Sequence, residues 1–356
     1  MSAARGGPGA RSGRTGVATA ALRRVALAAG LAALAALAGC QTDLPLAELK
    51  TRWGGPPSRY LPMDGIEVHW RDEGPATASL PGPPDALAAR AGTGTDVPAI
   101  LLLHGTGSSL HTWDGWAERL SPHMRVVRLD LPGFGLTGPH PSGDYSAAAT
   151  VDFLERFVAA AGLGRFAIAG NSLGGYYAWR FALRHPERVS ALVLVDAVGY
   201  PVEQGASRST AMRLARLPVI SELMRFLPVE GLIERSLRDT YADPRKVTPE
   251  LVERYADLMR RPGNRIAFGD RTRADPRPTG WERLTELRVP TLILWGAQDE
   301  WVPPSNAERF DRDIPDSELR IYPDLGHLPM EEDPDTTARD VLRFLRERAR
   351  SGGMPR

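Results

Sequence analysis

Short apolar runs alternate with longer amphipathic stretches from residue 99 to residue 350 of the chain. Runs of about four mostly apolar residues are typical of strands, and apolar residues three or four positions apart are typical of helices packed on a sheet. Because strands and helices alternate, we expect a parallel sheet covered by helices on both faces. Strands are predicted at 100–103, 126–129, 166–169, 192–195, 292–295 and 319–322, and helices at 113–120, 147–161, 173–185, 307–312 and 335–350.

Three segments depart from this alternation. A short run at 60–63 is followed by a turn at Asp64-Gly65 and by alternating apolar and polar residues at 66–71, which predicts a hairpin. Residues 74–96 are dominated by Ala, Gly, Pro and Thr and have no periodicity, so we expect an extruded loop. Residues 199–288 have helical periodicity without a convincing strand. A helical insertion between two strands of a sheet predicts a cap.

The composition is that of a globular protein and gives no reason to expect a nucleic-acid partner. The 356 residues are 42% hydrophobic and 24% charged, which is enough to build a full core. The 44 Lys and Arg are balanced by 43 Asp and Glu, whereas nucleic-acid binders carry a basic surplus. The single cysteine, Cys40, excludes an internal disulfide and a cysteine-based metal site.

The first 39 residues have the pattern of a signal peptide. They contain five arginines and no acidic residue, and their apolar run at 25–38 is shorter than the about 18 residues of a membrane span. The run ends in Leu-Ala-Gly-Cys, which resembles the bacterial lipobox, where the cysteine receives diacylglycerol and becomes the new N-terminus. We therefore predict a lipid anchor at Cys40, on a membrane of the bacterial cell envelope and facing the periplasm or the exterior. The alternative is an ordinary secretory signal with an incidental cysteine.

The residues that follow Cys40 mix polar side chains with two turn signals. Gly54-Gly55 and Pro56-Pro57 are typical of an irregular segment. We therefore predict that residues 40–59 form a lipidated, poorly ordered tether between the anchor and the folded body.

A Gly-x-Ser-x-Gly sequence, from Gly170 to Gly174, lies between a predicted strand and a predicted helix. The serine of such a junction sits on a sharp turn that exposes its hydroxyl group. Glycines are needed two positions before and after it because the turn leaves no room for side chains. We predict that Ser172 is a nucleophile; the alternative is a turn of small residues that packs a helix against a strand.

A serine hydroxyl needs a base, and the base needs a carboxylate that orients it. His327 follows the last predicted strand, in a loop that can lie over the carboxyl edge of the sheet beside Ser172. Asp299 and Asp196 each follow a predicted strand and are both candidates for the carboxylate. The chain order Ser, Asp, His favours Asp299.

The strand at 100–103 ends in a glycine-rich turn, Gly105-Thr106-Gly107. Such a turn leaves backbone N–H groups free to stabilise a developing oxyanion. We predict that the N–H groups of Thr106 and Leu173 form this oxyanion hole. His104 does not have the position of a base, and we interpret it as a hydrogen-bonding residue that supports the loop.

Five motifs follow one another between residues 60 and 350, and together they resemble the α/β-hydrolase family. The motifs are His104-Gly105, Asp130-Leu131-Pro132-Gly133-Phe134-Gly135, Gly170-Asn171-Ser172-Leu173-Gly174-Gly175, Trp295-Gly296-Ala297-Gln298-Asp299 and Gly326-His327. The resemblance implies an α/β fold with a mostly parallel eight-stranded sheet, a helical cap after the sixth strand, no cofactor or metal, and hydrolysis through a serine acyl-enzyme. It implies a core at 60–198 and 289–350 and a cap at 199–288, which follow the signal peptide predicted at 1–39 and the tether predicted at 40–59.

The residues around the predicted nucleophile narrow the reaction. Serine at position 172 argues against the family's epoxide hydrolases and haloalkane dehalogenases, which place aspartate there. The Gly-Asn-Ser-x-Gly-Gly sequence is similar to that of the meta-cleavage-product hydrolases, which break carbon–carbon bonds. Those enzymes usually carry a longer glycine run after His-Gly and a tryptophan after the catalytic histidine, whereas this chain has Thr106-Gly107-Ser108 and Leu328.

We therefore expect an esterase that acts on a small or medium, partly hydrophobic molecule. A carbon–carbon bond hydrolase is the first alternative. A lipid-anchored binding protein that kept the fold and lost the activity is an alternative of another class. Such a protein would lack a catalytic residue, and the sequence lacks none.

Overall fold

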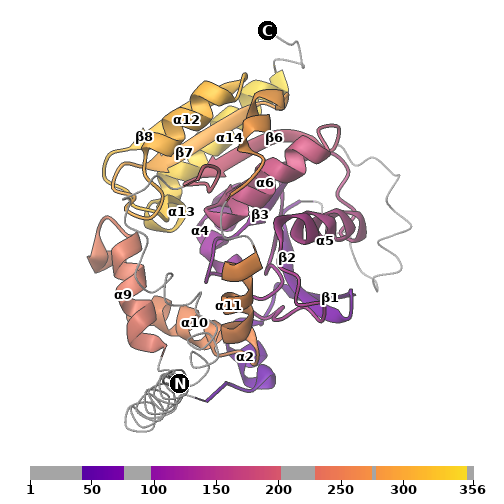
Figure 1. The fold of residues 1–356 in the computed structure, drawn as a ribbon, viewed down its shortest axis with the longest axis vertical. Helices are drawn as coiled ribbons and strands as arrows, with labels where there is room; N and C mark the ends of the chain where they lie inside the picture. The colour runs from indigo at the N-terminus through magenta and orange to yellow at the C-terminus, as the bar shows by residue number, and fades with distance from the viewer. Residues whose placement is uncertain (1–41, 76–97, 202–228, 275–277, 351–356) are drawn as a thin grey trace, which may run out of the picture. The chain divides into compact units, whose positions relative to one another are not determined.

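The computed structural model describes residues 42–75, 98–201, 229–274 and 278–350. One eight-stranded sheet, in the order β1-β2-β4-β3-β5-β6-β7-β8, forms their centre (Figure 1). β2 runs antiparallel to β1 and β4, and the other neighbouring strands are parallel, so the predicted mostly parallel sheet is confirmed. The strands are β1 (Ser58–Met63), β2 (Ile66–Glu73), β3 (Ala99–Leu103), β4 (Arg125–Leu129), β5 (Phe166–Asn171), β6 (Val189–Val195), β7 (Thr291–Gly296) and β8 (Ser317–Tyr322).

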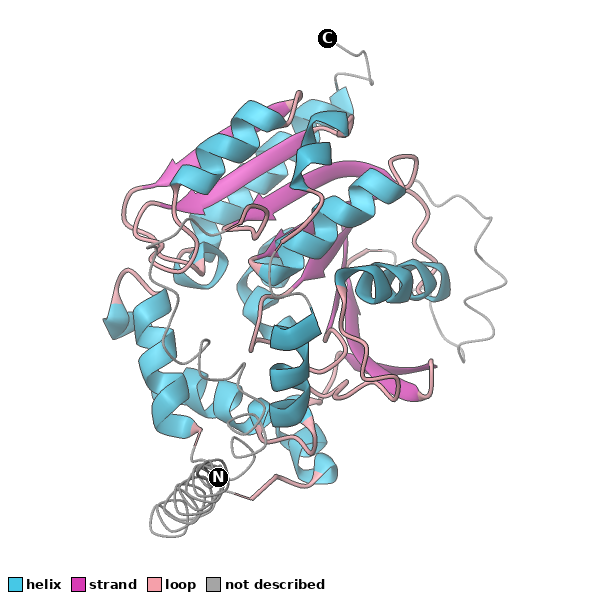
Figure 2. Cartoon of the chain, in the orientation of Figure 1, coloured by secondary structure: helices cyan, strands magenta, loops and turns pink. Residues whose placement is uncertain are grey.

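Helices cover both faces of the sheet (Figure 2). Successive residues of a strand point to opposite faces, so Leu101 and Leu103 of β3 join one buried cluster, and Ile100 and Leu102 join the other. The first cluster lies under α5 (Ala147–Ala160), α6 (Leu173–Arg184) and α12 (Ser305–Asp313). The second lies under α4 (Asp114–Leu120) and α14 (Pro334–Arg350).

The predicted hairpin, strands and helices outside the cap are confirmed, with shifts of a few residues at their ends. β6 begins at Val189, three residues before the predicted start, because the polar Ser190 interrupts the apolar run without interrupting the strand. The helix predicted from residue 113 is preceded by a 3-10 turn, η2 (Leu110–Trp113). Each of the six predicted runs lies within an observed strand.

A helical insertion separates β6 from β7, as the predicted fold required. Its described elements are α9 (Glu230–Thr240), η3 (Pro244–Lys246), α10 (Pro249–Met259), α11 (Asn264–Ala274) and η4 (Trp281–Glu286). The start of α10 is set by the side chain of Thr248, which accepts a hydrogen bond from Leu251 N–H, and by Pro249 at the first helical position. These helices are drawn in salmon and orange in Figure 1.

The prediction of a poorly ordered tether is wrong for the residues just before β1. Leu46–Trp53 form α2, which packs on the cap helix α10. Trp53 Nε1 donates a hydrogen bond to Asp257 Oδ2 of α10 at 2.9 Å, and Leu49 is fully buried. The glycines and prolines at 54–57 therefore mark only the turn between α2 and β1.

None of the helices within the described ranges is long and apolar enough to cross a membrane. The predicted signal peptide at 1–39 and Cys40 lie outside the described residues. So do most of the predicted loop at 74–96 and the first part of the predicted cap, residues 202–228.

Candidate active site

Ser172 lies between β5 and α6, on a sharp turn with a strained backbone conformation and closely packed neighbours. Its φ of 52° and ψ of −114° are in a region that residues with a β-carbon rarely adopt. A β-carbon at Gly170 would lie 2.3 Å from the backbone of Gly174, and one at Gly174 would lie 2.1 Å from Leu103 O. The predicted need for glycine on both sides of the serine is confirmed. Strained backbone of this kind concentrates at functional sites.

His327 and Asp299 are joined by a short hydrogen bond. His327 Nδ1 lies 2.7 Å from Asp299 Oδ2, and both residues are 5% exposed. Asp299 Oδ1 accepts hydrogen bonds from the N–H groups of Trp301, at 2.7 Å, and Val302, at 3.0 Å. Because Asp299 is the partner of Nδ1, Nε2 is the ring nitrogen that remains to exchange a proton with a hydroxyl group.

Asp196, the competing candidate, does not take that place. It ends β6, is fully buried and accepts a hydrogen bond from Gly296 N–H at 2.9 Å. One carboxylate oxygen of Asp196, one of Asp299 and a ring nitrogen of His327 lie within 4.8 Å of one another. Burial and the neighbouring charge of Asp299 raise the pKa of Asp196 well above the ordinary value of an aspartate. The partner of His327 Nδ1 is therefore Asp299, and Asp196 lies behind it.

The predicted oxyanion loop lies against Ser172. A β-carbon at Gly105 would be 3.1 Å from the β-carbon of Ser172, so the backbone that leads to Thr106 passes directly beside the serine. Leu173 is the first residue of α6, whose N-terminal N–H groups have no partner within the helix. These positions suit the N–H groups of Thr106 and Leu173 for the predicted role.

His104 has the supporting role that the sequence predicted. Its Nδ1 lies 2.8 Å from Gly105 O, and its Nε2 accepts a hydrogen bond from Leu131 N–H at 3.0 Å. Burial lowers the pKa of His104 to about 4, so the ring is neutral at physiological pH. Both ring nitrogens are occupied by backbone groups, which leaves none for proton transfer.

Asn171 is a site residue that the sequence analysis did not single out. Its Nδ2 donates hydrogen bonds to Val195 O at 3.2 Å and to His327 O at 3.0 Å. The residue next to the serine thereby holds the loop that carries His327. Asn171 was visible in the Gly-x-Ser-x-Gly motif, but its partners lie on the neighbouring strand β6 and in the loop after β8, which no local pattern connects.

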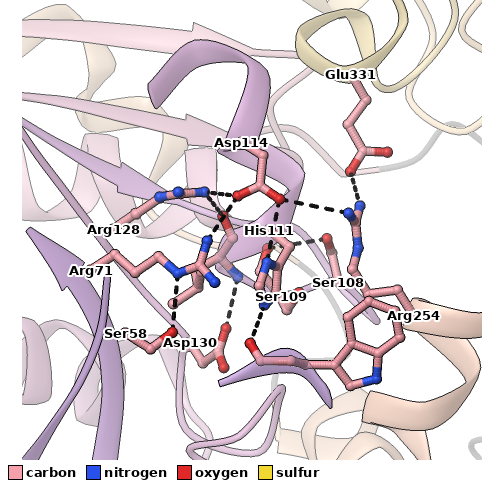
Figure 3. A network of polar contacts seen from close by, with 12 residues as sticks. Ser58, Arg71, Ser108, Ser109, His111, Asp114, Arg128, Asp130, Arg254 and Glu331 are labelled. Carbon is pink, nitrogen blue, oxygen red and sulfur yellow. Dashed lines mark hydrogen bonds and ion pairs between the residues drawn. The ribbon is translucent and has the colours of Figure 1, made fainter. Parts of the chain in front are cut away.

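The cap touches the same loops, and this contact was also not predicted. His327 N–H donates to Thr240 O at 2.7 Å, and Tyr255 of α10 lies 3.0 Å, through its hydroxyl group, from both Ser108 Oγ and Glu331 Oε1. Figure 3 shows Arg254 of α10 between Asp114 and Glu331, which is part of α13 (Pro329–Glu332). Cap residues therefore hold the loop after His327 and the loop after Gly107.

A second chain of serine, histidine and aspartate occurs away from Ser172. Ser58 Oγ lies 2.8 Å from His69 Nε2, and His69 Nδ1 lies 2.6 Å from Asp130 Oδ2. Ser58 begins an edge strand instead of standing on a strained turn, and its Oγ also accepts a hydrogen bond from Arg71 Nε at 3.1 Å. This chain fixes β1 against β2 and provides a matched control for the site at Ser172.

Asp196, Asp299 and His327 are also the one group in the described residues that could gather around a metal ion. Metal ligation through His327 Nδ1 would require the ring to leave Asp299, because a single nitrogen cannot serve both partners. The 2.7 Å hydrogen bond between them therefore fits a proton-transfer site better than a metal site.

Comparison with known proteins finds hydrolases among the similar chains. A hydrolase for 2-hydroxy-6-oxononadienedioate and 2-hydroxy-6-oxononatrienedioate from Pseudomonas putida is 30% identical, and the match covers 71% of this chain and 89% of that protein. A solved structure titled as a membrane phospholipase A and bacterial virulence factor is 25% identical, with a TM-score of 0.64 and coverage of 94% of this chain and 98% of the other. A thermophilic esterase from Thermogutta terrifontis is 27% identical, with a TM-score of 0.62 and coverage of 82% and 98%. The sequence model of the alpha/beta hydrolase fold matches residues 98–334, and the chain therefore belongs to the α/β-hydrolase family of enzymes.

Proposed function

We propose that this hydrolase cleaves a carboxylic ester of a small or medium, partly hydrophobic molecule through a serine acyl-enzyme. The observation that carries the proposal is the 2.7 Å hydrogen bond from His327 Nδ1 to Asp299, in a loop that Asn171 ties to the strained turn at Ser172. The proposal assigns Ser172 as the nucleophile, His327 as a base that acts through Nε2, and Asp299 as the carboxylate that orients the base. These are the groups that acyl transfer needs.

In the proposed mechanism Ser172 Oγ attacks the ester carbonyl carbon while His327 Nε2 accepts the hydroxyl proton. The N–H groups of Thr106 and Leu173 stabilise the oxyanion of the tetrahedral intermediate. His327 then gives its proton to the leaving alcohol, which departs and leaves the acyl group on Ser172. Water, deprotonated by His327, attacks the acyl-enzyme and releases the acid and the free serine.

Two features favour an ester over a carbon–carbon bond as the bond that is cleaved. The residue after His327 is Leu328, and the turn after Gly105 has a single further glycine before Ser108, so the chain departs from the meta-cleavage-product pattern at both places. Two of the similar proteins are named as enzymes that cleave esters, one as an esterase and one as a phospholipase A. The 30% identity with the dienedioate hydrolase of Pseudomonas putida favours the second candidate, a carbon–carbon bond hydrolase.

The test is a series of p-nitrophenyl esters of increasing acyl length, assayed with the purified wild-type protein, Ser172→Ala and Ser58→Ala. We expect the wild type to turn over these esters and Ser58→Ala to do so at the same rate. Ser172→Ala should keep at most about 10⁻³ of the wild-type turnover. The acyl-length optimum would then measure the space that the site offers to the acyl chain.

Ser58→Ala is the matched control because Ser58 is the other serine with a histidine and an aspartate behind it. Equal losses in both variants would show that the assay follows stability and not the nucleophile. A folded wild type that cleaves no ester but hydrolyses a dienoic diketone would favour the carbon–carbon bond hydrolase.

We also propose that the protein is anchored to a membrane of the bacterial cell envelope by diacylglycerol on Cys40, facing the periplasm or the exterior. The support is the Leu-Ala-Gly-Cys sequence behind an apolar run of 14 residues and a basic N-terminal segment. Such an anchor brings an esterase to substrates that partition into or lie beside a bilayer.

A further inference from the structure

A second buried carboxyl group, Asp196, lies behind the Asp299–His327 pair. Asp196 is 0% exposed, its φ of 45° is in the left-handed region, and its Oδ1 accepts a hydrogen bond from Gly296 N–H. Its carboxylate reaches within 4.8 Å of both Asp299 and His327. Two carboxyl groups this close in a buried site cannot both stay ionised, so one of them holds a proton.

The hydrogen-bond partners indicate which carboxyl group is protonated. Asp299 accepts three hydrogen bonds, one from the ring of His327 and two from backbone N–H groups, and each of them stabilises a carboxylate. Asp196 Oδ1 accepts one, and Asp196 Oδ2 receives none from the described residues although it is fully buried. A buried oxygen without a donor, beside an ionised carboxylate, fits an O–H group that donates to that carboxylate.

The charged groups around Asp196 also favour its protonated form. Asp299 after β7 and Glu332 of α13 are the acidic groups whose charges act on it, and His327 after β8 is the one basic group of the cluster. His327 is already paired with Asp299. Burial and both acidic neighbours raise the pKa of Asp196, which favours its protonated form.

We propose that Asp196 is a positioning residue that is protonated at neutral pH and donates a hydrogen bond from Oδ2 to the carboxylate of Asp299. This role rests on the proposed function, because it acts through Asp299 on the base of the reaction. The O–H group fixes the orientation of Asp299 and spreads its negative charge, which limits how strongly Asp299 holds a proton on His327. Asp196 does not touch the reacting atoms.

Asp196→Asn tests the protonation state because asparagine has the shape and hydrogen-bonding pattern of a protonated aspartic acid. Its Oδ1 can still accept from Gly296 N–H, and its Nδ2 can donate to Asp299. We expect the acid limb of the pH profile of kcat/KM on a p-nitrophenyl ester to stay where it is in the wild type. An ionised Asp196 would instead support the protonated imidazole, and its removal would move the acid limb down by about one pH unit, which would overturn the proposal.

Asp196→Ala tests the hydrogen bond itself, because alanine removes the donor to Asp299 and the acceptor of Gly296 N–H. We expect kcat to fall by about ten-fold or more, since a hydrogen bond to a charged group is lost, and to return in Asp196→Asn. An alanine variant as fast as the wild type would overturn the role. Asp311 is an exposed aspartate on α12, and Asp311→Asn is the control for replacing an aspartate away from the site.

A readout without substrate separates this proposal from the proposed function. The infrared carbonyl stretch of a protonated carboxylic acid at pH 7 is expected in the wild type and in Ser172→Ala, and is expected to be absent in Asp196→Asn. If the asparagine variant does not fold, the ¹³C chemical shift of the Asp196 carboxyl group in the wild type measures the same protonation. A protein with this signal and no ester turnover would overturn the esterase and leave Asp196 protonated, and a protein with turnover and no signal would overturn the proposal for Asp196.

Discussion

At the scale of single residues, Gly174 shows how little space the turn at Ser172 leaves. A β-carbon there would lie 2.1 Å from Leu103 O, which is backbone and cannot move aside as a side chain can. Gly174→Ala is therefore expected to lower the free energy of unfolding by about 1–3 kcal/mol. It should also lower kcat/KM on an ester by about 100-fold, because the serine and the oxyanion loop would be displaced relative to each other. Urea unfolding and an ester assay measure the two effects.

Gly164→Ala is the matched control for that change. Gly164 lies two residues before Phe166, the first residue of β5, and a β-carbon there would meet no atom within 4 Å. We expect this variant to unfold at the urea concentration of the wild type and to keep its activity. If Gly174→Ala behaved like Gly164→Ala, the close approach of α6 to β3 would not be what requires glycine.

At the scale of elements, α2 connects the segment after Cys40 to the cap. Trp53 Nε1 donates to Asp257 Oδ2, and Arg52 forms an ion pair with the same aspartate, whose side chain is almost fully buried. Trp53→Phe keeps most of the apolar ring and removes only the N–H donor, so Asp257 loses one of the groups that compensate its burial. We expect the amide groups of α2 to exchange hydrogen faster in this variant, as measured by hydrogen–deuterium exchange, with those of α14 unchanged.

An exposed ion pair on another element is the control for α2. Arg283 pairs with Glu286 at 2.8 Å, and both side chains are more than half exposed, so Arg283→Ala is expected to leave exchange in α2 unaltered. Unchanged exchange in Trp53→Phe would mean that the buried apolar contacts of Leu49, and not the hydrogen bond, hold α2 in place.

Buried strands could be predicted from the sequence and α2 could not, because only the strands are identified by their own apolar residues. The central strands β3, β5 and β7 are buried on both faces, so each left a mostly apolar run that identifies it without knowledge of its partners. α2 left no such signal, because it buries Leu49 alone and is otherwise held by contacts with a helix about 200 residues away. The sequence likewise indicated Ser172, His327 and the two candidate aspartates. The hydrogen bonds of Asn171 and the place of Asp196 beside Asp299 depend on which loops meet in space.

At the scale of the whole molecule, the proposed anchor point lies three residues before a side chain that contacts the cap. Asp43 forms an ion pair with Arg265 of α11 at 2.6 Å, and an extended chain covers at most about 3.6 Å per residue. The three residues from Cys40 to Asp43 therefore allow at most about 11 Å between the Cα atoms of Cys40 and Asp43. An anchored molecule would thus have its α2 and α11 side near the bilayer, so amphiphilic esters would reach the cap without first leaving the membrane surface.

Metabolic labelling with a palmitate analogue in a bacterial host, followed by mass spectrometry of the mature N-terminus, tests this arrangement. The wild type should carry the label and begin at a lipid-modified Cys40. It should carry two or more acyl chains, because one chain alone binds a membrane only marginally. Cys40→Ser should carry no label and retain esterase activity, since position 40 precedes the folded residues that form the site. Ser172→Ala is the reciprocal control, because it should keep the label and lose the activity. A mature wild-type protein that begins with an unmodified residue before position 40 would exclude the lipid anchor, and the side of the molecule near the membrane would then no longer follow from the contact between Asp43 and Arg265.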